Sequence, residues 1–76
     1  MNYLYDQGGR KFACMTPREF AARYDVTERS VYNWMTWGMP SIAFGDDVSE
    51  FRLIPIRLAD DWVEAMIRKG VLRSTL

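Results

Sequence analysis

The feature that most constrains the fold is the segment 15–40, which contains two short helix signals separated by a corner of two residues. Thr16 stands where an N-cap is expected, Pro17 occupies the first helical position, and Glu19 follows three residues after the cap. These residues predict a capping box, in which the threonine and glutamate side chains satisfy backbone N–H groups at the start of a helix. A first helix is therefore expected to begin at Pro17.

A second helix is predicted to start after Thr27, which is again an N-cap residue. It is expected to end before Gly38, which accepts a left-handed conformation, and before Pro40, which prevents further helix. Asp25 and Val26 lie between the two helices, and aspartate tolerates a positive φ better than most residues. Two helices joined this tightly are typical of a helix-turn-helix unit.

The second predicted helix has an apolar side and a polar side. At 100° per residue Val31, Trp34 and Met35 share the apolar side, and we expect Trp34 to lie in the core. The polar side and its flanks carry residue types that contact bases and phosphates in DNA-binding proteins. The candidate recognition-helix residues are Thr27, Glu28, Arg29, Ser30, Tyr32, Asn33 and Thr36. An ordinary solvated face has a similar composition, and this alternative stays open.

Residues 41–54 predict a β-hairpin directly after the second helix. Two apolar runs, 41–44 and 50–54, flank a turn rich in Gly, Asp and Ser. Such a hairpin is expected to act as a wing, with Arg52 as its candidate contact to the DNA backbone. The tip carries Asp46 and Asp47, which would repel phosphates, so the tip either points away from DNA or has another partner.

Residues 58–69 predict a C-terminal helix that stops at Gly70. The expected core face of this helix consists of Leu58, Trp62, Ala65 and Met66. The predicted fold class is mainly α with a small β-hairpin: a winged helix-turn-helix made of the helix-turn-helix, a two-stranded wing and a C-terminal helix.

The chain is expected to form one domain with short ends. Residues 1–11 are interpreted as a flexible N-terminal arm or a loosely docked strand, residues 12–70 as the winged DNA-binding domain, and residues 71–76 as a short tail. Further candidate contacts to the DNA backbone are Arg18, Arg10 and Lys11, for which solvated charges are the alternative.

Composition limits the function classes. Ten basic and ten acidic residues cancel, which argues against a strong nonspecific DNA binder. The chain has no histidine and one cysteine, Cys14, so we expect no metal site, no cofactor, no disulfide within the chain and a buried structural thiol. We expect neither an enzyme nor a small-molecule substrate, because no paired acid–base or nucleophile arrangement is visible. No apolar run reaches the length of a membrane span, and the cytoplasm is the expected location.

The segments S-V-Y-N-W (30–34) and G-M-P (38–40), followed by a hairpin and a helix that begins near Pro55 and carries Trp62, resemble the excisionase (recombination directionality factor) family and its MerR-like winged-helix relatives. The similarity covers about residues 12–69. It implies that the second helix enters the major groove of double-stranded DNA and that the wing follows the backbone. It also implies that copies line up head to tail on DNA and bend it beside an integrase.

Two departures and several alternatives accompany this resemblance. The family is typically basic, with a basic wing, whereas this chain is neutral with an acidic wing. The N-W…G-M-P portion also resembles the DNA-recognition domain of phage terminase small subunits, and a small phage or plasmid transcription regulator is a further alternative. MerR-type regulators and terminase small subunits continue into longer segments, so a 76-residue chain is expected to be an excisionase. A protein-interaction module is the alternative from another class.

Overall fold

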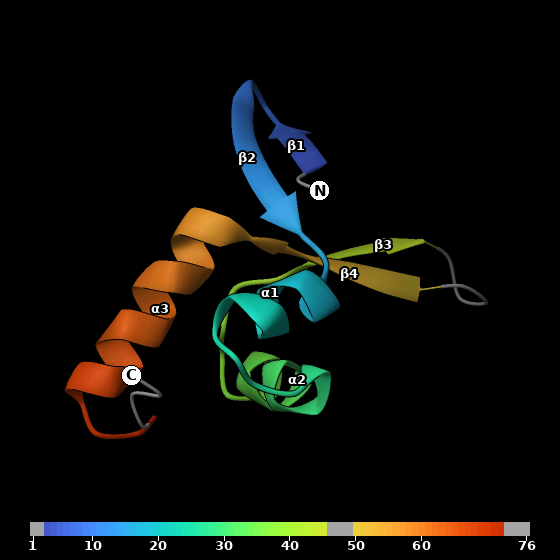
Figure 1. Cartoon of the computed structure of the whole chain (residues 1–76). Coiled ribbons are helices and arrows are strands. Elements are labelled where there is room, and N and C mark those ends of the chain that lie inside the picture. The colour runs from blue at the N-terminus through green and yellow to red at the C-terminus, as the bar shows by residue number, and fades with distance from the viewer. Residues whose placement is uncertain (1–2, 46–49, 73–76) are drawn as a thin grey trace.

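The computed structural model describes residues 3–45 and 50–72 of the chain (Figure 1). Within these residues, strands and helices follow the order β1–β2–α1–α2–β3–β4–α3. The strands are β1 Tyr3–Gln7, β2 Arg10–Met15, β3 Ile42–Gly45 and β4 Glu50–Pro55, and the helices are α1 Pro17–Arg23, α2 Glu28–Thr36 and α3 Ile56–Arg68.

The strands form an antiparallel sheet in the order β1-β2-β4-β3. It consists of two hairpins that meet where β2 pairs with β4, at Cys14↔Pro55 and Met15↔Ile54. From this junction the two hairpins extend in different directions (Figure 1). Tyr5 of β1 nevertheless contacts Phe44 of β3, with ring centroids 5.3 Å apart. The sheet is therefore curled, and its two outer strands approach each other.

This sheet shows that the predicted fold class, a mainly α winged helix-turn-helix, is wrong. The chain has a β-β-α-α-β-β-α order with a four-stranded sheet, and a two-stranded wing accounts for only half of that sheet. The missing half is the β1–β2 hairpin, which occupies much of the segment interpreted as an arm (residues 1–11). The proposed division into arm, domain and tail otherwise stays a prediction.

The β1–β2 hairpin turns at Gly8 and Gly9. Both residues have positive φ, 58° and 85°, as a two-residue type I′ hairpin turn requires. The backbone N–H of Gly9 also donates to Oδ1 of Asp6 at 3.2 Å. A glycine pair between two short apolar runs is a known hairpin signal, and the sequence analysis interpreted this pair as the end of an arm instead.

The two short helices form as the sequence predicts. Thr16 Oγ1 accepts the backbone N–H of Glu19 at 3.1 Å, and the Glu19 carboxylate accepts the backbone N–H of Thr16 at 2.9 Å, which confirms the capping box. Thr27 caps α2 through the N–H of Ser30. Asp25, in the corner, has φ 54°. Local capping thus fixes where both short helices begin.

The β3–β4 hairpin is also confirmed. Its register pairs Ile42 with Leu53 and Phe44 with Phe51, and these last two rings stack with centroids 5.5 Å apart. The acidic tip residues Asp46 and Asp47 lie outside the described residues.

All three helices contribute to one apolar core. Phe20 and Val31 are fully buried, and Trp34 is 8% exposed, which confirms the predicted core role of Trp34. Cys14 is fully buried as well, as predicted. The Trp34 ring contacts aromatic residues of α1 and α3, with centroids 6.4 Å from Phe20 and 6.4 Å from Trp62. The connected core consists of Met15, Phe20, Ala21, Val31, Trp34, Met39, Ile54, Ala59 and Val63.

The predicted core face of α3 is shifted from the observed one. Ala59 and Val63 are buried, whereas Leu58, expected in the core, is 44% exposed. Trp62 packs against the core only in part. The reason is that α3 starts at Ile56, directly after the buried strand end, so the β4–α3 junction sets the phase of the helix. The small side chain of Ala59 then allows a close approach to the sheet.

A polar cluster of Arg23, Tyr24 and Asp60 links α1 to α3. Arg23 forms two bonds to the Asp60 carboxylate, at 2.7 Å and 3.2 Å, and the Tyr24 hydroxyl donates to the same carboxylate. Burial, and then the hydrogen bond to Asp60, raises the pKa of Tyr24 above its ordinary value. The Tyr24 ring also packs on Phe20, so this cluster continues the aromatic core to the surface.

Trp34→Ala is expected to lower the free energy of unfolding by about 3–5 kcal/mol, because it removes a large buried ring. A domain of 76 residues has a total of about 4–11 kcal/mol, so the loss should abolish or strongly lower the thermal transition. Circular dichroism measures this transition. The matched control is Trp37→Ala, since Trp37 is 57% exposed and its loss should cost below about 1 kcal/mol. Unfolding of Trp34→Ala near the parent midpoint would contradict the core placement.

The free energy of unfolding is expected to fall as the pH rises above about 10, the ordinary pKa of tyrosine. The pKa of Tyr24 is higher in the folded state than in the unfolded state, so the protonated hydroxyl stabilises the fold. This contribution is complete below the pKa of the unfolded state and is lost as the pH approaches the pKa of the folded state. Urea unfolding at several alkaline pH values measures the slope, to which the one proton of Tyr24 can add at most about 1.4 kcal/mol per pH unit. Tyr24→Phe should reduce the slope, and the part that remains is expected from Cys14, because burial also raises the pKa of its thiol. An unchanged slope would exclude Tyr24 as a source.

Candidate nucleic-acid interface

Helix α2 buries its apolar side and presents its polar side to solvent. Val31 and Trp34 are buried, and Met35 packs against the core in part. Ser30 is half-buried at the edge of the polar side. The other predicted recognition residues are all exposed: Thr27, Glu28, Arg29, Tyr32, Asn33 and Thr36. The predicted orientation of the helix is confirmed, and contact with nucleic acid stays a prediction.

Both ends of α2 are held in place. At the start, Thr27 Oγ1 accepts the Ser30 N–H at 3.1 Å, and the two hydroxyl oxygens lie 3.0 Å apart. At the end, Gly38 has φ 112° and the Met39 N–H donates to the Trp34 carbonyl at 3.0 Å. The Met39 side chain is then buried at 3% exposure. The helix therefore presents its outer side chains from a fixed frame.

The exposed side chains of α2 offer donors and acceptors suited to base edges. Arg29 carries a guanidinium fork that matches guanine, and the Asn33 amide matches adenine. Glu28 can accept from the amino group of cytosine. The Thr36 hydroxyl, in contrast, donates to the Tyr32 carbonyl of its own helix at 3.2 Å. Arg29 and Asn33, one turn apart, are thus the strongest pair for reading bases.

Tyr32 of α2 and Arg52 of β4 lie at the same groove, which has a volume of about 460 Å³. Arg52 Nη1 also donates to Ser41 Oγ at 3.1 Å. We call this the apolar groove, and its lining residues are Tyr3, Leu4, Tyr5, Thr16, Pro17, Tyr32, Phe44, Phe51, Arg52 and Leu53. The predicted neighbourhood of the second helix and the β3–β4 hairpin is therefore present in the structure.

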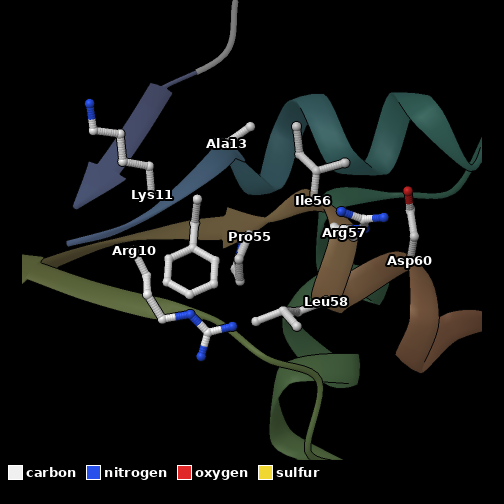
Figure 2. A pocket seen from close by; sticks show the side chains of 9 residues that line it. Arg10, Lys11, Ala13, Pro55, Ile56, Arg57, Leu58 and Asp60 are labelled. Atoms are coloured by element: carbon white, nitrogen blue, oxygen red, sulfur yellow. The ribbon is translucent and has the colours of Figure 1, made fainter. Parts of the chain in front are cut away.

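The three other candidate backbone contacts fall in different places. Arg18 is exposed in the first turn of α1 and directly follows Pro17, which lines the apolar groove. Arg10 and Lys11 are exposed on β2 and line a second groove, whose lining residues include none from α2 (Figure 2). The structure therefore places Arg52 beside Tyr32 of α2 and Arg18 one residue after a lining residue of that groove, and it places Arg10 and Lys11 at a separate groove.

Sequence reasoning missed Arg57, which lines the second groove together with Arg10 and Lys11. A basic residue two positions after Pro55 is visible in the sequence, but nothing local indicates that it faces β2. That proximity arises from the β2–β4 pairing, which joins residues about forty positions apart.

The described residues provide little for other chemistry. In residues 3–45 and 50–72 no cluster of three or more His, Cys, Asp or Glu side chains is arranged to hold a metal ion. Burial raises the pKa of the Cys14 thiol, which disfavours the reactive thiolate. None of the described helices has the length and apolar character that crossing a membrane requires.

No family model, curated protein or solved structure matches the chain. The resemblance to excisionases therefore stays a prediction from short motifs, and the function must be argued from the residues of the chain itself.

Thr27→Ala is expected to lower the free energy of unfolding by about 1 kcal/mol, because Thr27 caps α2. Thr27→Ser keeps the capping oxygen and should unfold close to the parent in the same urea titration. A Thr27→Ala variant with parental stability would show that the cap adds nothing to the free energy of unfolding. Thr27 would then be a candidate DNA contact only.

Proposed function

We propose that this chain binds double-stranded DNA and places the exposed side of α2 in the major groove. The observation that carries the proposal is the fixed, nine-residue helix whose apolar side is buried and whose opposite side exposes Arg29 and Asn33. An α-helix with its side chains is about 10–12 Å wide and the major groove is about 12 Å wide, so such a helix fits.

Contacts to the DNA backbone support this orientation. In the proposed complex Arg52, beside Tyr32 at the apolar groove, and Arg18, at the start of α1, contact phosphates next to the helix. Among the described residues we assign these two cations and Arg29 to this surface, in a chain of zero net charge. The affinity is therefore modest, and log K against log salt has a slope of about −2 to −3.

A finer role, excisionase activity beside an integrase, has its support in the S-V-Y-N-W and G-M-P motifs alone. In that role the protein directs excisive recombination by binding and bending DNA. A regulator of transcription and a terminase-like DNA-recognition domain use the same α2 contacts. Genomic position separates these roles, because an adjacent integrase favours the first and an adjacent terminase large subunit favours the last.

A protein-interaction module is the second candidate, and one observation favours it. The apolar groove exposes large apolar side chains beside α2, including Leu4 at 77% and Phe51 at 57% exposure. Clustered exposed apolar residues often mark protein interfaces. DNA binding is preferred because the exposed side of α2, which reaches this groove at Tyr32, carries hydrogen-bonding groups.

Arg29→Ala/Asn33→Ala is expected to weaken binding to the best duplex by about 30-fold or more. Each bidentate base contact is worth about 1–3 kcal/mol, and 1.4 kcal/mol corresponds to a factor of ten. Fluorescence anisotropy with tiled duplexes from the genomic neighbourhood of the protein measures the affinity, at two salt concentrations.

The matched control is Arg68→Ala, which removes the same charge from the exposed end of α3 and should change affinity only slightly. Circular dichroism verifies that every variant is folded. Equal binding by the double variant and the parent, or binding of no duplex above competitor DNA, would favour the protein-interaction module.

A further inference from the structure

A second groove lies between β2 and the start of α3. Figure 2 shows the Arg10 side chain leaving β2 toward Leu58 of α3 and the Lys11 side chain leaving it in the opposite direction, with Arg57 at the start of α3. Its volume is about 630 Å³, within the range of ligand-binding pockets. We call it the cationic groove, and it is lined by Arg10, Lys11, Phe12, Ala13, Pro55, Ile56, Arg57, Leu58 and Asp60.

The cationic groove concentrates positive charge in a chain that is neutral overall. Arg10, Lys11 and Arg57 are exposed, and among the described residues none of them forms an ion pair. Asp60 is the one acidic residue in the lining, and its carboxylate is bound by Arg23 of α1 and by Tyr24 at the C-cap of α1. Arg10 and Arg57 are therefore available to an anionic ligand, and the local carboxylate is already neutralised.

The floor of the cationic groove is apolar. Phe12 is half-buried, and Leu58 is 44% exposed although it belongs to a helix that packs on the core. Arg10 lies over the Phe12 ring, 5.8 Å from its centroid. A smaller hollow of about 140 Å³ shares Phe12, Pro55 and Leu58 and continues the floor toward Pro40. A matching ligand therefore needs both negative charge and an apolar group.

We propose that the cationic groove binds an acidic peptide segment of a partner protein. The segment places an apolar side chain on Phe12 and Leu58 and carboxylates against Arg10 and Arg57. Apolar anchors with surrounding charged contacts are the usual composition of protein interfaces, and arginine is enriched in them. A DNA backbone has phosphates but no apolar side chain to cover Phe12 and Leu58, so it fits this groove less well. This proposal is independent of DNA binding by α2.

Selection from a random dodecapeptide display library tests this proposal. Peptides selected on the wild-type protein should be enriched in Asp or Glu next to Leu, Ile, Met or aromatic residues. Synthetic versions of them should bind at least tenfold more weakly to Arg10→Glu/Arg57→Glu and to Leu58→Ser. They should bind within about twofold to the control Arg68→Glu/Lys69→Glu, which places the same charges on the exposed end of α3.

Two results would overturn the proposal. The first is a selection that yields no acidic–apolar peptides, or yields peptides that bind all variants equally. The second is a loss of duplex DNA affinity in Arg10→Glu/Arg57→Glu as large as that in Arg29→Ala/Asn33→Ala, which would assign the groove to the DNA backbone. Retained peptide binding by Arg29→Ala/Asn33→Ala shows that the groove acts separately, so that failure of the DNA proposal and failure of this one are distinguishable.

Discussion

The packing of aromatic rings around Trp34 is the interaction on which the rest of the structure depends. Trp34 lies in α2, and its ring meets Tyr24, the C-cap of α1, at 6.0 Å and Trp62 of α3 at 6.4 Å between centroids. The three helices are thereby held together by a few large side chains, which suits a chain too short to build an extensive core. The same packing decides which side of α2 is left in solvent, so the orientation of the candidate DNA surface is a consequence of the core.

The short pairing between β2 and β4 has the second large effect. Because only two residue pairs join the hairpins, each hairpin leaves the junction in its own direction. One groove combines α2 with β1 and the β3–β4 hairpin, and the other combines β2 with the start of α3. A small neutral chain can in this way separate the proposed surface for DNA from the proposed cationic surface for another partner.

Sequence reasoning succeeded where local interactions decide the structure. The caps at Thr16 and Thr27, the positive φ of Asp25 and the presence of the β3–β4 hairpin all follow from short stretches of sequence. The exposed set on α2 was predictable for the same reason, since a capped helix has a known phase. The Gly8–Gly9 turn carried an equally local signal and was misinterpreted, which led to the wrong fold class.

The remaining errors concern contacts between distant residues. The core face of α3 was misplaced because the end of β4, and not the helix itself, sets its phase: Ala59 faces the core and Leu58 does not. The position of Arg10 and Lys11 beside Arg57 was not foreseen, because it arises only through the β2–β4 pairing. Helical periodicity alone contains neither piece of information.

The central claim is that α2 is the DNA-reading element, and an NMR titration of the ¹⁵N-labelled protein with its best duplex tests it most directly. The account predicts that the largest shift changes occur at the backbone amides of α2 and at the side-chain amide of Asn33, with smaller changes at Arg18 and Arg52. Changes confined to β2 and the start of α3, with α2 unaffected, would contradict it.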